Sequence, residues 1–397
     1  MITGSAYLCL PGISVTIRAE DSELRSRAAN LRVKGKETVT PVRSLCLISS
    51  KASEARVLSR GDAPVSMLEL PREVTKDGLQ AMAGDSAKQE AFSRQIRYRF
   101  ADPRLTEEIT VFAVKYNNKL STEARNRTPA RAETELLCSV LDHPYNDIWV
   151  PPVVPMLSGQ EYLPYLEDFY KEAKSYSNVD VAGLIPHVSR LELRLLADFY
   201  VKQGINYFVM DLDGKNPLDM VANIGEVNRI LRGIEKEYNT PCFLHAINVP
   251  FTRSHWKNTM IPAKDILLFE MGFNAFGSSH IRRQLPKEFL EKVHLLPKPH
   301  YRVFNRRDYG YYRDDVPNLR EMVAEDGQTT VSLDSFSSDL TWSEVRAQEK
   351  VFNVERHCIE AGEIRRNLLT GESLAQYIRG KAALPVTFLK KVFRMAG

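Results

Sequence analysis

Between residues 136 and 273 the chain alternates between amphipathic segments and short apolar runs, and this alternation limits the possible folds more than any other feature. The apolar runs are residues 181–188, 205–214, 242–249 and 265–273. The segments with apolar residues at helical spacing are 162–176, 191–204 and 220–238. Strands that are apolar on both faces are typical of a parallel sheet covered by helices on both sides. The sequence therefore predicts an α/β fold, either a barrel or a doubly wound open sheet.

The remaining chain divides into two further parts. Residues 1–60 contain short strand-like stretches, and we expect an N-terminal β segment that leads into the main fold. Residues 61–300 contain a further strand at 109–116 and the alternating series, and a parallel α/β barrel of roughly 250 residues would fit there. Residues 301–397 are predicted to form a β insert followed by C-terminal helices packed on the barrel.

Composition excludes several classes of protein. The five cysteines form no Cys-x-x-Cys pair, which argues against a disulfide framework and a cysteine zinc site and favours the cytoplasm. No apolar run approaches the roughly 18 residues of a membrane span, and we expect no signal peptide. No glycine-rich phosphate loop follows a predicted strand, and we expect no cofactor. The net charge of +4 permits nucleic-acid binding without requiring it.

Polar residues gather where the predicted strands end. They are His187, Ser189, Asp211, Asp213, Asn248, Glu270 and Asn274. In a barrel the C-terminal ends of the strands form the active-site face. Asp211 and Asp213 alternate along one strand, so we expect their side chains on the same side, as substrate-binding or proton-transfer groups. The alternative is a structural role, in which they cap the helix that follows Pro217.

Arginine and tyrosine are densely mixed in residues 301–315. Such a mixture suits nucleic-acid contact through stacking and ion pairing, and the candidates are Arg306, Arg307, Tyr311 and Tyr312. Arg282 and Arg283 follow a loop of glycine and serine and could meet phosphates. The alternative for 301–315 is an ordinary β insert with aromatic cross-strand pairs.

Several segments, in order along the chain, resemble the tRNA-guanine transglycosylase family and its relatives that act on DNA. They are residues 19–49, where Thr40-Pro41 leads into an apolar strand, and residues 128–150, 184–214, 240–250 with 264–273, and 351–378. The resemblance implies a TIM-like (β/α)8 barrel with an N-terminal β extension and a C-terminal helical extension. It also implies exchange of guanine in tRNA or DNA for a 7-deazaguanine such as preQ0 or preQ1.

The chain departs from the pattern of that family at several places, and His187-Val188-Ser189 stands where the family has Gln-Gly-Gly. The family's zinc site is Cys-x-Cys-x-x-Cys with a histidine on the following helix. Here the matching positions hold Ser332, Asp334, Ser337 and Phe352, so we expect no zinc. Packing of Phe336, Phe352 and Trp342 should hold this region instead. The Asp-Ser-Gly-Gly-Phe-Gln motif is absent, and its nearest remnant is Asp85-Ser86.

Base exchange requires a carboxylate that attacks the sugar C1′ and a second acid that protonates the leaving purine. The resemblance aligns Glu270 with the family's nucleophile and Asp85 with the aspartate of the Asp-Ser-Gly-Gly-Phe-Gln motif. Asp211 and Asp213 are candidates by their position at a strand end. His187, Ser189, Asn248 and Asn274 would then bind the substrate. Two alternatives stay open: a non-catalytic subunit that pairs with another transglycosylase-like chain, and an unrelated barrel enzyme for a small sugar or phosphate. A homodimer is also compatible with the resemblance.

Overall fold

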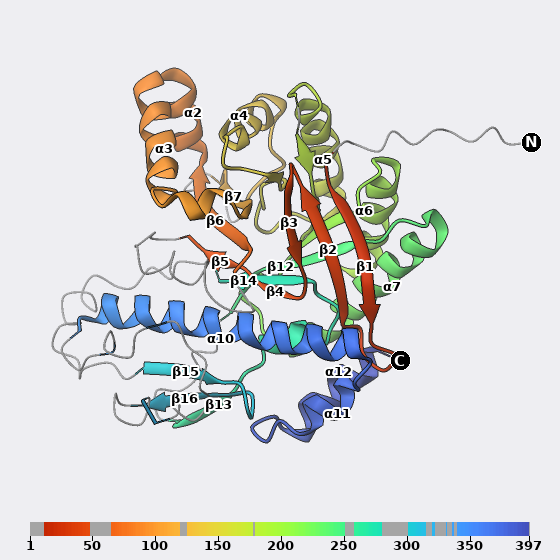
Figure 1. Cartoon of the computed structure of the whole chain (residues 1–397). Helices are drawn as coiled ribbons and strands as arrows, with labels where there is room; N and C mark the ends of the chain where they lie inside the picture. Colours follow the sequence, from red (N-terminus) through yellow and green to blue (C-terminus); the bar gives the residue numbers. More distant parts are fainter. Residues whose placement is uncertain are drawn as a thin grey trace, which may run out of the picture.

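The computed structural model describes residues 12–47, 65–119, 125–177, 179–250, 258–279, 301–314, 320–321, 331, 336 and 340–396. It has an α/β fold with two five-stranded sheets, and every strand pair within them is parallel (Figure 1). The first sheet has the order β10-β11-β12-β14-β4 and the second the order β5-β6-β7-β8-β9. The predicted α/β class is therefore confirmed.

The strands have the following bounds in the two sheets. The first contains β10 (Gly183–Ile185), β11 (Tyr207–Asp211), β12 (Phe243–Val249), β14 (Ala275–Ser278) and β4 (Val42–Arg43). The second contains β5 (Leu45–Cys46), β6 (Met67–Thr75), β7 (Ile109–Asn117), β8 (Ile148–Trp149) and β9 (Asp180–Val181). All five residues of β11 and all seven of β12 are buried, as expected of strands covered on both faces.

Two chain segments connect the sheets directly. Only Ser44 separates β4 from β5, and its backbone N–H donates to the carbonyl of Phe276 in β14 (2.9 Å). Only Ala182 separates β9 from β10, and its N–H donates to the carbonyl of Trp149 in β8 (2.8 Å). Each segment thus leaves one sheet and enters the other. Residues 42–46 belong to these parallel sheets, although they precede the predicted start of the barrel at residue 61.

Helices follow the strands in the predicted alternation. They are α2 (Lys76–Gly84), α3 (Ser86–Arg99), α4 (Arg131–Leu141), α5 (Gly159–Ala173), α6 (Arg190–Lys202) and α7 (Val221–Tyr238). Ser158 and Ser189 each begin a helix with a capping box, in which a glutamate three residues later bonds back to the cap. Aromatic side chains fill the space between α5 and α6, where the rings of Tyr170 and Phe199 meet edge to face. The predicted helices at 162–176, 191–204 and 220–238 are confirmed within a few residues.

The predicted strand at 265–273 is wrong. Residues Ile266–Leu268 form a 3₁₀ turn, η3, and the strand β14 begins only at Ala275. All three residues of the turn are buried, because a short run of consecutive apolar residues fits a buried helical turn as well as a buried strand. Gly272 then takes a left-handed φ of 95°, which bends the chain into β14.

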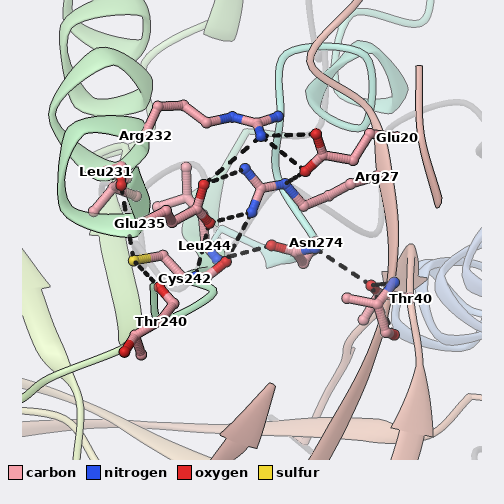
Figure 2. A network of polar contacts seen from close by, with 11 residues as sticks. Glu20, Arg27, Thr40, Leu231, Arg232, Glu235, Thr240, Cys242, Leu244 and Asn274 are labelled. Carbon is pink, nitrogen blue, oxygen red and sulfur yellow. Dashed lines mark hydrogen bonds and ion pairs between the residues drawn. The ribbon is translucent and has the colours of Figure 1, made fainter. Parts of the chain in front are cut away.

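An antiparallel sheet of β1 (Ser14–Glu20), β2 (Arg27–Val33) and β3 (Lys36–Val39) precedes the parallel strands. Figure 2 shows how β1 and β2 are tied to α7: Arg27 pairs with Glu235, and Arg232 pairs with Glu20 (2.8 Å). Arg27 also donates to the carbonyl of Cys242 (3.2 Å), one residue before β12 begins. The N-terminal sheet is therefore fixed beside the N-terminal end of β12.

The C-terminal region consists of a small antiparallel sheet and three helices. The sheet contains β13 (Met260–Pro262), β16 (Gly310–Asp314) and β15 (Tyr301–Asn305), in that order. The helices are α10 (Trp342–Thr370), α11 (Leu374–Arg379) and α12 (Val386–Ala396), as the C-terminal helical pattern predicts (Figure 1).

Two side chains of α10 form hydrogen bonds with the backbone of β15. Asn353 accepts from the N–H of Phe304 (2.8 Å) and donates to the carbonyl of Arg302 (2.9 Å). Glu349 accepts from the N–H of Arg302 (3.0 Å). No helix in the described ranges is long and apolar enough to span a membrane.

Candidate active site at the C-terminal ends of the parallel strands

Asp211 and Asn248 form a hydrogen-bonded pair at the C-terminal ends of neighbouring strands. The side-chain amide of Asn248 donates to Asp211 Oδ1 at 2.7 Å. Asp211 is the last residue of β11, Asn248 lies near the end of β12, and both side chains are buried. The carboxylate supplies acceptors and the amide supplies both a donor and an acceptor, which is the chemistry needed to bind the polar edge of a base. Of the residues predicted at the strand ends, these two are brought together.

The backbone around this pair is strained. Asp213 and Asn248 have left-handed φ values of 49° and 58°, and neither is a glycine. The N–H of Gly214 donates to the carbonyl of Asn248 (3.0 Å), so the turn after β11 is bonded to the end of β12. Left-handed residues of this kind persist where the surroundings impose them, and they concentrate at functional sites. The left-handed residues and the Asp211–Asn248 pair therefore indicate the same candidate site, at the C-terminal ends of β11 and β12.

The expected pairing of Asp211 with Asp213 on one side of a strand is wrong. The strand ends at Asp211, and the chain then turns so that Asp211 is buried while Asp213 is exposed. Asp211 Oδ1 accepts the backbone N–H of Asp213 at 2.9 Å, which holds that turn. The period of two applies only within an extended strand, so it fails where the strand stops. Asp211 accordingly fixes the backbone of Asp213.

His187 and Ser189 follow β10 at the same end of the sheet. His187 is exposed in the connection to α6. Ser189 is the N-cap of α6: its hydroxyl accepts the N–H of Glu192, and the Glu192 carboxylate accepts the N–H of Ser189 (2.9 Å). Because the Ser189 hydroxyl is engaged in capping α6, Ser189 is a weaker candidate for substrate contact than its place in the sequence indicated.

A second polar group lies inside the sheets, and sequence reasoning did not find it. Glu69 of β6 and His245 of β12 are fully buried, and Glu69 Oε1 lies 2.7 Å from His245 Nε2. Tyr207 of β11 bonds His245 Nδ1 (2.9 Å), and Ser44 lies 3.2 Å from His245 Nε2. The residues of this internal cluster come from strands of both parallel sheets. His245 lies in the middle of the apolar run 242–249, and a glutamate at position 69 within the apolar run Met67–Leu70 is the sequence signal for a buried polar group.

Glu270 does not lie at the C-terminal end of a strand. It follows η3 and precedes β14, so it lies at the N-terminal end of the parallel strands, opposite Asp211 and Asn248. Glu270 is completely buried, and neither carboxylate oxygen has a hydrogen-bond partner. The pKa of Glu270 is raised to about 8, mainly by burial; the nearby Glu360 contributes to this rise, and Lys381 opposes it. This placement separates Glu270 from the other candidate carboxylates.

Asp85 and Asn274 also have structural positions. Asp85 is the N-cap of α3 and accepts the N–H groups of Ala87 (2.9 Å) and Lys88 (3.3 Å). Asn274 immediately precedes β14, at the N-terminal end of the sheet. Its amide oxygen accepts the N–H of Leu244 (3.0 Å), and its amide nitrogen lies 3.4 Å from Thr40 Oγ1 (Figure 2). The expectation that Asn274 lies at the C-terminal end of a strand is therefore wrong, because that strand begins after it.

The predicted nucleic-acid contacts in the hairpin β15–β16 are only partly exposed. Tyr311 is buried, and its hydroxyl donates to Asp265 Oδ2 (2.7 Å) and lies 2.9 Å from His357 Nε2. Tyr312 donates to Asp308, Arg306 pairs with the buried Glu360 (3.4 Å), and Arg307 is exposed. Arg282 and Arg283 lie outside the described residues. Tyr311 therefore cannot stack on a base in this arrangement.

Aromatic packing holds part of the region that sequence analysis aligned with the zinc site of the transglycosylase family. The rings of Phe336 and Phe352 meet edge to face at 5.5 Å, and Tyr301 contacts Phe336 at 4.9 Å. This confirms the predicted packing of Phe336 and Phe352. Ser332, Asp334 and Ser337 lie outside the described residues, as does the side chain of Trp342. Within the part of the chain that the structure describes, no group of three or more His, Cys, Asp and Glu residues could hold a metal ion.

Comparison with known proteins gives no family. No protein-family model matches the sequence, and no curated protein matches it significantly.

Proposed function

We propose that the protein is a base-exchange transglycosylase that replaces guanine in tRNA or DNA by a 7-deazaguanine at the C-terminal ends of its parallel strands. The observation that carries this proposal is the buried Asp211–Asn248 pair, with Asn248 Nδ2 at 2.7 Å from Asp211 Oδ1. A carboxylate next to an amide can bind the Watson–Crick edge of a purine, which presents N–H donors beside an acceptor. The order of sequence segments that resemble the transglycosylase family points to the same substrate class.

A closed barrel is part of the proposal. Ser44 and Ala182 are each the single residue at which the chain leaves one five-stranded sheet and enters the other. If both connections join the sheets edge to edge, the segments Val42–Cys46 and Asp180–Ile185 act as two strands of an eight-stranded (β/α)8 barrel. The C-terminal strand ends of such a barrel are where active sites form. The Asp211–Asn248 pair would then lie at the barrel mouth.

Asp213 is the carboxylate best placed for the chemistry at this mouth. Its side chain is exposed, and the bond from its N–H to Asp211 fixes its backbone. In the proposed reaction a carboxylate oxygen of Asp213 attacks C1′, the C1′–N9 bond breaks, and the leaving purine takes a proton from an acid in the site. The incoming base then attacks C1′ with N9, gives its N9 proton to the acid that the first step deprotonated, and releases the carboxylate. In this scheme Asp211 binds the base together with Asn248 and also fixes the backbone of Asp213.

Incorporation of labelled guanine or preQ0 into bulk tRNA and into DNA tests the proposal. Asp213→Asn should abolish incorporation, because asparagine also accepts a left-handed φ and the variant loses only the negative charge. Glu270→Gln is the matched control, since Glu270 lies at the opposite end of the strands, and it should keep the wild-type rate. Lack of incorporation into either polymer by the wild-type protein would sink the proposal, and full activity of Asp213→Asn would remove Asp213 from it.

The second candidate is a non-catalytic subunit that supports another transglycosylase-like chain. One observation favours it: Asp85 caps α3 and Glu270 is buried away from the site, so both carboxylates that the family resemblance assigned to chemistry have structural positions. A wild-type chain that binds nucleic acid without incorporating any base, and that restores activity to a partner subunit, would establish this role.

A further inference from the structure

The helices α5 and α6 lie side by side and point in the same direction (Figure 1). At their first turns the N–H of Gly159 donates to Glu192 Oε1 (2.7 Å), 33 positions further along the chain. At their C-terminal ends Lys174 Nζ donates to Gln203 Oε1 (2.9 Å), 29 positions further along. Residues of α5 therefore lie level with residues of α6 that follow them by 29 to 33 positions.

An exposed groove follows the line between the two helices, and its side chains are arranged in layers. From the first turns onward, successive layers hold Leu163 with Leu195, Glu167 with Asp198, and Lys171 with Lys202. Within each layer the two residues are separated by a number of positions that lies between those of the two end contacts, so they lie level with each other. Successive layers are about one helical turn apart, or roughly 5 to 6 Å. The α5–α6 groove therefore has an apolar, an acidic and a basic layer, in that order.

The chain leaves the charges of this groove unpaired. All four side chains of the acidic and basic layers are exposed, and none forms a hydrogen bond or a salt bridge with a residue that the structure describes. The acidic residues precede the lysines by four positions, which is a spacing at which ion pairs form within a helix. Leu195 is 42% exposed, and Leu191, one turn before it on the same face of α6, is 73% exposed. The groove thus combines unpaired charges of both signs with exposed apolar surface.

We propose that the α5–α6 groove is the contact surface of a homodimer. A two-fold axis that crosses both helices at right angles, between the acidic and the basic layer, packs each helix antiparallel on its own copy. Glu167 then faces the partner's Lys171, and Asp198 faces the partner's Lys202. Such an interface is isologous, because one patch that carries both signs in matched layers is complementary to itself.

The charge pattern also selects among partners and orientations. A two-fold axis parallel to the helices would place Glu167 on the partner's Asp198, and the repulsion excludes that arrangement. A partner of one sign, such as a nucleic-acid backbone, would be repelled by one of the two charged layers. A second copy of this chain satisfies both layers, and this inference does not depend on the proposed function.

The dimensions of the groove predict a weak dimer. Helices of 15 and 13 residues are about 20 Å long, and two such helices give a contact at the low end of protein–protein interfaces. In the antiparallel arrangement Leu163 and Leu195 face the last turns of the partner's helices, where the aliphatic part of the partner's Lys174 covers them. Monomer and dimer should therefore exchange, with a dimer fraction that rises with protein concentration and falls with salt.

Sedimentation velocity of the full chain at increasing protein and salt concentrations tests this inference. Lys171→Glu/Lys202→Glu makes both charged layers acidic, and Glu167→Lys/Asp198→Lys makes both basic. Each double variant alone should self-associate roughly tenfold or more weakly than the wild type, because like charges then face each other. An equimolar mixture of the two should form a heterodimer, since every acidic side chain again faces a lysine. Lys88→Glu/Lys390→Glu, which reverses two exposed lysines of α3 and α12, is the matched control and should dimerise like the wild type.

The mixture separates loss of the interface from loss of the fold, because misfolded chains would not regain association when they are combined. A wild-type chain that stays monomeric at concentrations up to about 1 mM would overturn the proposal. Persistence of the wild-type dimer in either double variant would place the interface elsewhere. Failure of the mixture to associate, or an equally large loss in the control variant, would also overturn it, since general charge would then explain the effect.

Discussion

The carboxylate of Glu69 on β6 occupies the space next to the backbone of Gly277 on β14. A Cβ atom at position 277 would lie 1.7 Å from Glu69 Oε1 and 1.9 Å from Glu69 Cδ. Because β6 and β14 belong to different five-stranded sheets, this contact is one of the places where the two sheets meet. The missing side chain at residue 277 makes room for the buried pair of Glu69 and His245.

Gly277→Ala should therefore destabilise the protein. The new methyl group would overlap the Glu69 carboxylate, which His245 holds in place, and overpacking of this kind costs about 1–3 kcal/mol. Chemical denaturation measures the change in the free energy of unfolding. Gly233→Ala in α7 is the matched control: nothing lies within 4 Å of its added Cβ, and alanine favours the helix by about 1 kcal/mol. Equal stability of the two variants would contradict the close approach of Glu69.

Glu270→Gln should stabilise the protein at alkaline pH. The pKa of Glu270 is raised to about 8 in the folded chain, so folding favours its protonated form. The contribution to stability is complete below the ordinary pKa of 4.5 and is lost as the pH rises through about 8. The glutamine variant cannot ionise, and its unfolding free energy should fall less between pH 5 and pH 9. The control is Glu90→Gln, which removes a carboxylate from the exposed part of α3. Parallel pH curves for wild type and Glu270→Gln would refute this expectation.

Asn248 has a backbone role that is separable from its side-chain role. Asn248→Gly keeps the left-handed φ of 58° but loses the bond to Asp211, whereas Asn248→Ala also imposes strain. The alanine variant should be less stable than the glycine variant by about 1 kcal/mol, because alanine disfavours left-handed φ. In the incorporation assay both variants should lose base binding to a similar degree. Equal stability of the two would argue that the backbone relaxes at this position.

The aromatic contact between Phe352 of α10 and Phe336 should stabilise the protein without a metal. Phe352→Ala would remove a fully buried ring that contacts Phe336, at a cost of about 3–5 kcal/mol. Treatment of the wild-type protein with EDTA should leave the melting temperature unchanged, because phenylalanine offers no zinc ligand. A chelator-induced fall in the melting temperature would show that a metal is bound elsewhere in the chain.

The local pattern of apolar residues predicted most helices and strands, but it did not predict the contacts between them. The helices α5, α6 and α7 follow from apolar residues at helical spacing, because each packs one face on the sheet. The run at 265–273 was misassigned because a buried turn and a buried strand have the same composition. That error moved Glu270 and Asn274 to the opposite end of the strands from the one predicted.

The candidate site was foreseen only in part. Asp211 and Asn248 were identified because each ends an apolar strand of a parallel series. Glu69 and His245 are separated by 176 residues, and no local pattern links two inward-facing side chains at that distance in sequence. Tyr311 was expected on a binding surface, but its hydroxyl contacts His357 of α10 and Asp265, the residue that precedes η3, and its side chain is buried. Such enclosure depends on packing between distant segments.

The bonds from α10 to β15 affect self-association as well as folding. A strand at the margin of a sheet exposes backbone N–H and carbonyl groups that can recruit a strand from another molecule. In this chain Asn353 and Glu349 occupy the groups of Arg302 and Phe304 that would otherwise offer such pairing. Side chains of α10 thus satisfy backbone groups of β15 that a neighbouring strand would otherwise bond. Loss of these two side chains would convert a protected margin into a template for intermolecular β pairing, and aggregation would then compete with refolding.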